Sequence, residues 1–367
     1  MDIKIGFKNS GVSEECFAEK RAASGKVLDG LWAGGTDNGW VQAPLNVKTQ
    51  ELDFILNVAD VMKQEAELLV VVGADEAILP AKAAVNALPN TQDGIPVRFI
   101  GQNFCTAQME ELMGVMSRMG TVLCVVSKDG KEPCVQAALS VLKELLEKKY
   151  ENQNVERRII AVTEQGSELA DEADKSGYVT FDYPADVPLL YGALTPAAIF
   201  PMAVAGIDVR DFIAGAKLMA TSPKWDLDGA DYAIVRAMAE GCMMERISTF
   251  DSRFIGLCQW MEAMHRVKLA GGRVCMTQGL YNGPCGDGVL ETLLFAETCG
   301  EPLMIPDGNY SGRSMAQLNA EVYGQAIEEL CEAGRKVVQI SLPKADAFEF
   351  GQLVYFLQTS CDIAAEL

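Results

Sequence analysis

Short, continuously apolar runs alternate with longer segments of helical periodicity through the first half of this 367-residue chain. The apolar runs, which we expect to form strands, lie at residues 68–73, 97–100, 122–126, 158–162 and 178–181. The amphipathic segments, which we expect to form helices, lie at residues 49–63, 76–88, 106–118, 133–149 and 167–176. Apolar strands that alternate with such helices are typical of a parallel sheet covered on both faces. The pattern therefore predicts a doubly wound α/β domain.

The same alternation restarts in the second half. Strands are expected at residues 246–250, 273–277, 302–305 and 336–340. Helices are expected at residues 213–219, 228–244, 253–265, 289–297, 314–333 and 347–365. The chain is thus predicted to fold as two nested, doubly wound parallel-sheet domains. Residues 1–50 have no clear period and contain turn pairs, so we expect an extended arm that packs on the body.

Residues 194–208, with the sequence LTPAAIFPMAVAGID, separate the two halves. Thr195 and Pro196 are suited to begin a helix, and Gly206 is suited to end it. A helix that is apolar on all sides is buried, and this one is too short and too interrupted by proline to span a bilayer. We therefore predict a buried helix at the junction between the two halves.

These patterns divide the chain into five parts. The predicted parts are an N-terminal arm (1–50), a first domain (51–193), a hub helix with its linker (194–225), a second domain (226–345) and a C-terminal helix (346–367).

The net charge of −20 disfavours nucleic acids and anionic membrane surfaces as partners. The chain has 11 cysteines, none in C-x-x-C spacing, and a single histidine. The spacing argues against a zinc ribbon or a thioredoxin-type motif, and we expect no metal and no cofactor. A cysteine-rich chain whose N-terminal residues contain no apolar signal segment is expected in the reducing cytoplasm.

Residues 194–208 also resemble the signature of the phosphoglucose isomerase family, a Leu-Thr-Pro helix that ends in A-V-A-G-I-D. The matching residues are Leu194, Thr195, Pro196, Pro201, Ala203, Val204, Ala205, Gly206, Ile207 and Asp208. The resemblance implies two domains of the sugar-isomerase (SIS) type, a sugar-phosphate ligand and a homodimer.

Residues 127–133, which follow an apolar run, resemble the family's phosphate loop. Ser127, Lys128 and Gly130 match its Ser-Lys-Thr/Ser-Gly-Thr-Thr pattern. Asp129, Lys131 and Glu132 stand where the family has hydroxyl side chains. A carboxylate about 4 Å from a phosphate costs roughly 1 kcal/mol per charge pair in water. Lys128 and Lys131 offset part of that cost, and the alternative is a solvated charged loop.

A second loop, residues 73–79, resembles the family's G-I-G-G-S-Y-L segment. Gly73 and Leu79 remain, whereas Asp75 and Glu76 replace the glycine pair and Ala77 replaces the serine. The acidic pair suits the first turn of a helix, and it also brings negative charge to the place where the family binds an anion. Gly73 is thus a weaker substrate-binding candidate than the residues of the phosphate loop.

The catalytic positions implied by the resemblance are degenerate. Leu190 replaces an arginine, Val267 stands near the position of the general base, and Cys285 stands in place of the ring-opening histidine. The family's catalytic lysine belongs to a segment that would follow Leu367. Isomerisation of an aldose to a ketose requires both an acid and a base, so the resemblance supports the fold more strongly than the activity.

Other residues offer alternative chemistry. Glu262 is the carboxylate nearest to the missing base, whereas His265 is expected to be a packing or surface residue. Cys285 is a nucleophile candidate only if His265 reaches it. Asp226, Asp228 and Asp231 lack the remainder of a calcium loop and fit a helix-capping cluster better.

Three functional hypotheses follow. The first is a phosphoglucose-isomerase-like protein without isomerase activity that binds a sugar phosphate or another carbohydrate derivative. The second is an active glucose-6-phosphate isomerase with a rebuilt site. The third is a scaffold or regulatory protein that binds no sugar.

Overall fold

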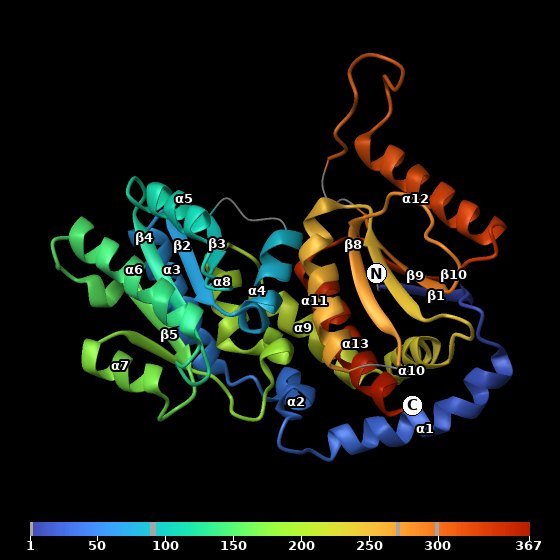
Figure 1. Cartoon of the computed structure of the whole chain (residues 1–367), viewed down its shortest axis with the longest axis horizontal. Coiled ribbons are helices and arrows are strands. Elements are labelled where there is room, and N and C mark those ends of the chain that lie inside the picture. Colours follow the sequence, from blue (N-terminus) through green and yellow to red (C-terminus); the bar gives the residue numbers. More distant parts are fainter. Residues whose placement is uncertain (1–2, 89–92, 269–271, 298–300) are drawn as a thin grey trace. The chain divides into compact units, whose positions relative to one another are not determined.

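The computed structural model describes residues 3–88, 93–268, 272–297 and 301–367, apart from the side chains of residues 223–227. Two compact units divide the chain. Residues 35–209 form the first-sheet unit, and the residues before Gly35 and after Val209 form the second-sheet unit. Each unit contains one five-stranded sheet and packed helices (Figure 1). The prediction of an α/β fold with two parallel-sheet domains is confirmed.

The first sheet is entirely parallel. In spatial order its strands are β3 (Val97–Ile100), β2 (Leu68–Gly73), β4 (Thr121–Val126), β5 (Ile159–Thr163) and β6 (Val179–Asp182). Its principal helices are α3 (Thr49–Glu65), α4 (Asp75–Ala87), α5 (Thr106–Met116), α6 (Pro133–Lys149) and α7 (Glu168–Ser176). Every residue of β2, β4 and β5 is buried, because helices cover both faces of the sheet.

The hub helix is α8 (Pro196–Val204), and it belongs to the first-sheet unit. This unit also contains three short helical elements, α2 (Gly39–Asn46), η1 (Val155–Arg158) and η2 (Leu189–Leu194). All residues of α8 are buried, and the helix packs on α3, α4 and η2. Thr195 begins the helix without capping it, since its hydroxyl donates to the Gly192 carbonyl at 2.7 Å. Gly206, with φ +80°, ends it in the left-handed conformation that glycine adopts at low cost.

The second sheet is parallel except at one edge. Its strands, in order, are β1 (Lys4–Asn9), β10 (Lys336–Leu342), β9 (Val289–Ala296), β7 (Met244–Thr249) and β8 (Val274–Leu280). β1 pairs antiparallel with β10, and the other pairs are parallel. The helical elements of this unit are α1 (Glu14–Trp32), α9 (Val209–Thr221), α10 (Pro223–Met238), η3 (Ser252–Phe254), α11 (Ile255–Val267), α12 (Met315–Glu332) and α13 (Ala347–Glu366).

The N-terminal stretch that we expected to be extended is largely helical. Ser13 begins α1, where its hydroxyl accepts a hydrogen bond from the Cys16 N–H at 3.2 Å. Only Phe17 and Ser24 of this helix are buried, so its sequence carries little apolar periodicity. The helix packs on α10 and α13, and β1 adds the edge strand of the second sheet. Tertiary contacts decided the structure of this stretch.

Residues 289–297, expected to form a helix, instead form strand β9, and that expectation is wrong. All eight residues of β9 are buried, because the strand lies between β10 and β7 in the middle of the sheet. Periodicity cannot distinguish a fully apolar strand from a buried helix. The expected helix at 228–244 ends earlier, at Met238, and the expected strand at 302–305 contributes only an isolated bridge between Met304 and Ser314.

Within the described residues, no helix combines the length and apolar character needed to cross a membrane.

Candidate functional site

The carboxyl edge of the first sheet brings two of the expected binding residues together. Gly73 ends β2 and pairs with Val126, the last residue of β4. Ser127 follows Val126 directly, so Gly73 and Ser127 lie on neighbouring strand ends. Ligands of parallel α/β sheets bind at this edge, which makes it the first candidate site.

The Ser127 hydroxyl is already occupied by the chain itself. Its side chain is buried, and its oxygen accepts a hydrogen bond from the Gly130 N–H at 2.8 Å. The same hydroxyl donates to the Glu132 carboxylate in a short contact. The Lys131 N–H donates to a carboxylate oxygen of Asp129 at 2.9 Å, in an exposed hydrogen bond within the same loop. The groups that would hold a phosphate are thus bonded within the loop.

Lys128 is paired as well. Its ammonium lies 2.8 Å from the Glu164 carboxylate and donates to the carbonyls of Ala185 and Val187 at 3.1 and 3.2 Å. It also lies 5.3 Å from the centroid of the Tyr183 ring. Lys131 is exposed, with its nitrogen 4.0 Å from Glu168. The loop therefore presents little uncompensated positive charge.

A polar hollow of about 610 Å³ adjoins this loop. Ser127 and Gly130 line it together with several charged residues of α6 and α7. The charged residues are Lys143, Glu144, Glu147, Glu168 and Glu172. Because the lining carries more carboxylates than ammonium groups, its electrostatic potential weakens the binding of an anion at this loop.

Gly130 is the backbone element on which the loop depends. Its φ is +78°, and a Cβ at this position would lie 2.7 Å from the Leu169 nitrogen. We expect Gly130→Ala to lower the free energy of unfolding by roughly 2–3 kcal/mol, from left-handed strain and a backbone clash. Gly166→Ala is the matched control, because Gly166 has φ +76° but no atom within 4 Å of its Cβ position. Urea denaturation measures both variants, and equal losses would contradict the role of the close approach.

Two of the degenerate catalytic positions carry groups without acid–base chemistry. Leu190 is buried within η2. Val267 is the last residue of α11 and is 62% exposed. Its neighbour Lys268 pairs with Asp362 at 2.8 Å.

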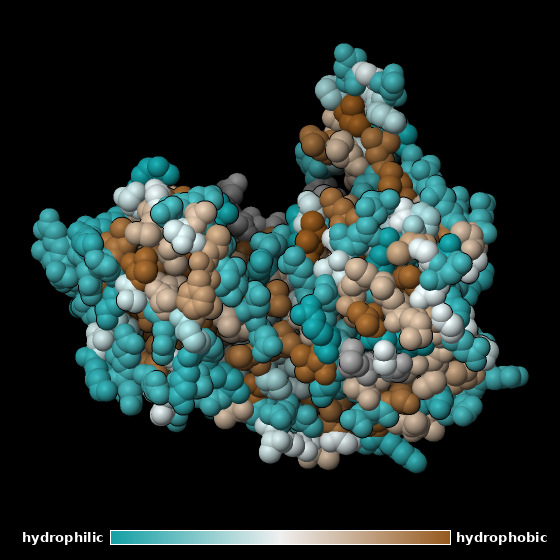
Figure 2. Space-filling model, in the orientation of Figure 1, coloured by the Kyte–Doolittle hydropathy of each residue, from teal (hydrophilic) through white to brown (hydrophobic). Residues whose placement is uncertain are grey.

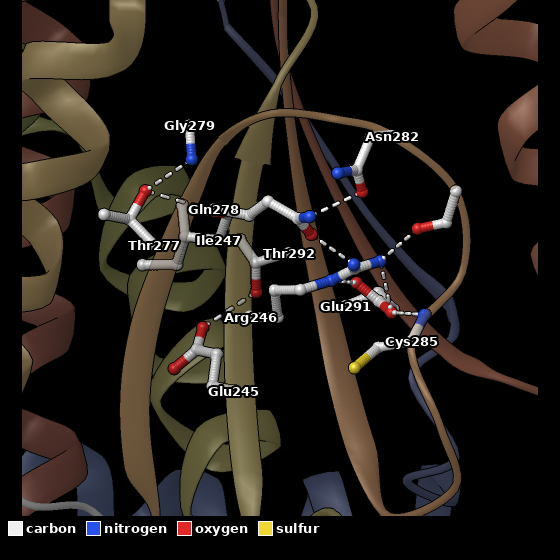
Figure 3. Close-up of polar contacts among 11 residues, drawn as sticks. Glu245, Arg246, Ile247, Thr277, Gln278, Gly279, Asn282, Cys285, Glu291 and Thr292 are labelled. Carbon is white, nitrogen blue, oxygen red and sulfur yellow. Dashed lines mark hydrogen bonds and ion pairs between the residues drawn. The ribbon is translucent and has the colours of Figure 1, made fainter.

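Cys285 lies in the loop that connects β8 to β9 across one face of the second sheet (Figure 3). Its N–H donates to a Glu291 carboxylate oxygen at 3.2 Å. Arg246 bonds to both oxygens of that carboxylate, at 2.7 and 2.8 Å, and donates to the Gly283 carbonyl at 2.7 Å. Gln278 accepts a further bond from Arg246 in a short contact. This buried ion pair fixes the loop that carries Cys285.

Glu262 and His265, the alternative acid–base residues, are already engaged in contacts within the chain. One Glu262 oxygen pairs with Arg266 at 2.6 Å, and the other accepts a hydrogen bond from the Thr277 N–H at 2.9 Å. His265 is buried, and burial, with Arg236 nearby, lowers its pKa to about 4. Neither residue is positioned at an open site for proton transfer.

Sequence reasoning missed Arg246, Gln278 and Glu291, which together hold the β8–β9 connection. The available signal was charge inside apolar runs, since Arg246 lies in the strand sequence MERIST and Glu291 in VLETLLFA. Charged residues are buried when they are paired, so two such positions of opposite sign indicate a candidate pair.

The cluster of aspartates at residues 226–231 is also partly accounted for by an ion pair. Asp231 accepts two hydrogen bonds from Arg21, at 2.8 and 2.7 Å, and the Asp226 side chain lies outside the described part of the chain.

No protein-family model matches the chain. Among curated proteins, it is 28% identical over 393 residues to a glucose-6-phosphate isomerase of Parabacteroides distasonis, covering 96% of this chain and 87% of that protein. It is 26% identical over 371 residues to a glucose-6-phosphate isomerase of Bacillus thuringiensis, covering 91% and 82%.

Two solved structures share the fold over nearly the whole chain. A hypothetical protein from Thermus thermophilus matches with TM-score 0.88 and 20% identity, covering 99% of this chain and 94% of that one. A glucose-6-phosphate isomerase from Chlamydia trachomatis matches with TM-score 0.79 and 13% identity, covering 99% and 84%. At these identities, the structural likeness establishes the architecture alone.

Proposed function

We propose that this chain, which is similar to curated glucose-6-phosphate isomerases over most of its length, is a divergent relative of them that binds a carbohydrate derivative of the sugar-phosphate class without isomerising it. The binding site is the carboxyl edge of the first sheet, at Gly73 and the Ser127–Lys128–Gly130 loop. The protein acts there as a ligand-binding relative of an enzyme.

The proposal that catalysis is lost rests on the side chains at the degenerate positions. Leu190 is a buried hydrocarbon, Val267 is an exposed one, and the Cys285 backbone is tied to a buried ion pair. Isomerisation requires a group that moves a proton between neighbouring carbons, and each such acid or base contributes roughly 10²–10⁴-fold in rate. The nearby substitutes, Glu262 and His265, are both engaged in other contacts.

The loop residues support retained binding. Ser127 and Gly130 keep the hydroxyl and the left-handed glycine, and Lys128 lies between them in sequence. A phosphorylated ligand would have to displace Glu132 from Ser127 and draw Lys128 away from Glu164. We therefore expect weak binding, in the millimolar range, rather than the tight binding of a free loop.

The test combines thermal unfolding with turnover on one sample. We expect millimolar glucose 6-phosphate or fructose 6-phosphate to raise the melting temperature by about 1 °C, since a ligand at a concentration near its Kd stabilises the state that it binds by about 0.4 kcal/mol. We expect no conversion between the two sugars above the uncatalysed rate. Measurable turnover would overturn the proposal and support an active isomerase with a rebuilt site.

The third possibility, a scaffold that binds no sugar, is favoured by one observation: Ser127 and Lys128 already have carboxylate partners. Unchanged melting temperature with both sugar phosphates and with the unphosphorylated sugars would support it. The same measurement thus separates all three functions.

Family resemblance further supports a cytoplasmic homodimer. Apolar side chains are exposed on the segment before and at the start of α12, which forms the projection at the top of Figure 2. These side chains belong to Leu303, Met304, Tyr310 and Met315. Exposed apolar patches are typical of protein interfaces. Sedimentation equilibrium at micromolar concentration measures the association.

A further inference from the structure

We propose that Glu245, His265 and Cys275 bind a zinc ion inside the second-sheet unit. This site is separate from the carbohydrate site proposed above, and it does not depend on it. The three residues are the members of a cluster of potential metal ligands that is buried on all sides.

Three elements bring these residues together on one face of the sheet. Glu245 in β7 is the register partner of Cys275 in β8, so their side chains project to the same face. Helix α11 packs on both strands and carries His265 near its end. Glu245 is 2% exposed, Cys275 is 7% exposed and His265 is 1% exposed. Rigid strands and a packed helix thus hold all three donors.

The spacing of the donor atoms suits a tetrahedral metal. His265 Nδ1 lies 3.4 Å from Glu245 Oε2 and 3.3 Å from Cys275 Sγ. All three donor atoms lie within 4.8 Å of one another. Zinc binds oxygen, nitrogen and sulfur at about 2.0–2.3 Å, which places neighbouring donors about 3.3–3.8 Å apart. Only small side-chain movements separate the present arrangement from coordination.

The donor types select the metal. A carboxylate oxygen, an imidazole nitrogen and a cysteine sulfur form a set of intermediate softness that suits zinc. Calcium and magnesium prefer oxygen donors alone, so neither fits.

Hydrogen bonds orient the carboxylate. Glu245 Oε1 accepts from the Tyr232 hydroxyl at 2.9 Å and from the Thr292 hydroxyl at 2.7 Å, the latter drawn in Figure 3. Arg236 donates to Oε2 at 2.9 Å. Partners of this kind are typical around metal-binding carboxylates, whose orientation they fix.

The charges of the cluster suit a divalent cation. Glu245 and the Cys275 thiolate supply two negative charges against the two positive charges of zinc. The thiolate is the form of cysteine that binds metal, so the Cys275 proton passes to solvent when zinc binds.

The experiment measures metal content in the full chain, expressed with zinc in the medium and dialysed against metal-free buffer. We expect about one zinc per chain, and replacement by cobalt should give thiolate-to-cobalt charge-transfer bands in the near ultraviolet. Cys275→Ala and His265→Ala are expected to lower the zinc content at least tenfold. Cys258→Ala is the matched control, since Cys258 is a buried thiol of the same unit outside the cluster, and it should keep its zinc.

Wild-type protein with less than about 0.1 zinc per chain, or without cobalt–thiolate bands, would overturn the proposal. So would Cys275→Ala protein that retains its zinc. Either result would leave a metal-free hydrogen-bonded network around Glu245. The wild-type measurement does not depend on whether any variant folds, and it requires no sugar ligand, so it is independent of the proposed function.

Discussion

Glu132→Thr is expected to tighten the binding of glucose 6-phosphate and inorganic phosphate by roughly 5- to 700-fold. In the wild type, a phosphate on Ser127 would lie next to the Glu132 carboxylate, which contacts the same hydroxyl. Two like charges about 4 Å apart repel by about 1 kcal/mol in water and about 4 kcal/mol near a protein surface, and each 1.4 kcal/mol corresponds to tenfold in affinity.

The substitution preserves the local structure. Glu132 is the N-cap residue of α6, and its side chain makes no capping hydrogen bond there. Threonine is a favourable N-cap residue, and it restores the hydroxyl of the family pattern. Isothermal titration calorimetry measures the affinities of wild type and variant under the same salt conditions.

Glu168→Thr is the control for a general change in charge. Glu168 lines the same hollow and makes no contact with Ser127, so its replacement should change the phosphate affinity by no more than a few-fold. Equal gains in the two variants would attribute the effect to the overall field. No gain in Glu132→Thr would show that this carboxylate does not control access of phosphate to the loop.

Arg246→Met is expected to lower the free energy of unfolding of the second-sheet unit by about 3–5 kcal/mol. The substitution leaves the Glu291 carboxylate buried without its charged partner, and that residue is 0% exposed. It also removes the donor that holds the Gly283 carbonyl and thereby the β8–β9 loop. Chemical denaturation, followed by a probe in this unit, measures the loss.

Arg266→Met provides the comparison on the same unit. Arg266 pairs with Glu262 at 2.6 Å, but its side chain is 70% exposed, so this pair should contribute at most about 1 kcal/mol. The double variant Arg246→Met/Glu291→Met should recover part of the stability, because it leaves no unpaired buried charge. A loss below about 1 kcal/mol in Arg246→Met would contradict the role assigned to this ion pair.

Local sequence was informative for the candidate site only in part. The motif at residues 127–130 predicted the position of Ser127 at a strand end, and the structure places it there beside Gly73. The bonds from Ser127 to Glu132 and from Lys128 to Glu164 could not be predicted, because they depend on where the loop turns. Glu164 is 36 positions from Lys128 and reaches it only because β5 lies next to β4.

The sequence by itself determined the two-sheet α/β architecture, the strand and helix order of the first-sheet unit and the buried character of α8. These features follow from apolar periodicity, because the spacing of apolar residues reflects which faces of each helix or strand are buried by its neighbours. The tertiary structure alone decided that residues 289–296 form a central strand, that α1 is a helix, and that Arg246 faces Glu291 and Glu245 faces Cys275. Such pairings depend on strand register and on packing between distant segments, and hydrophobic periodicity carries no information about either.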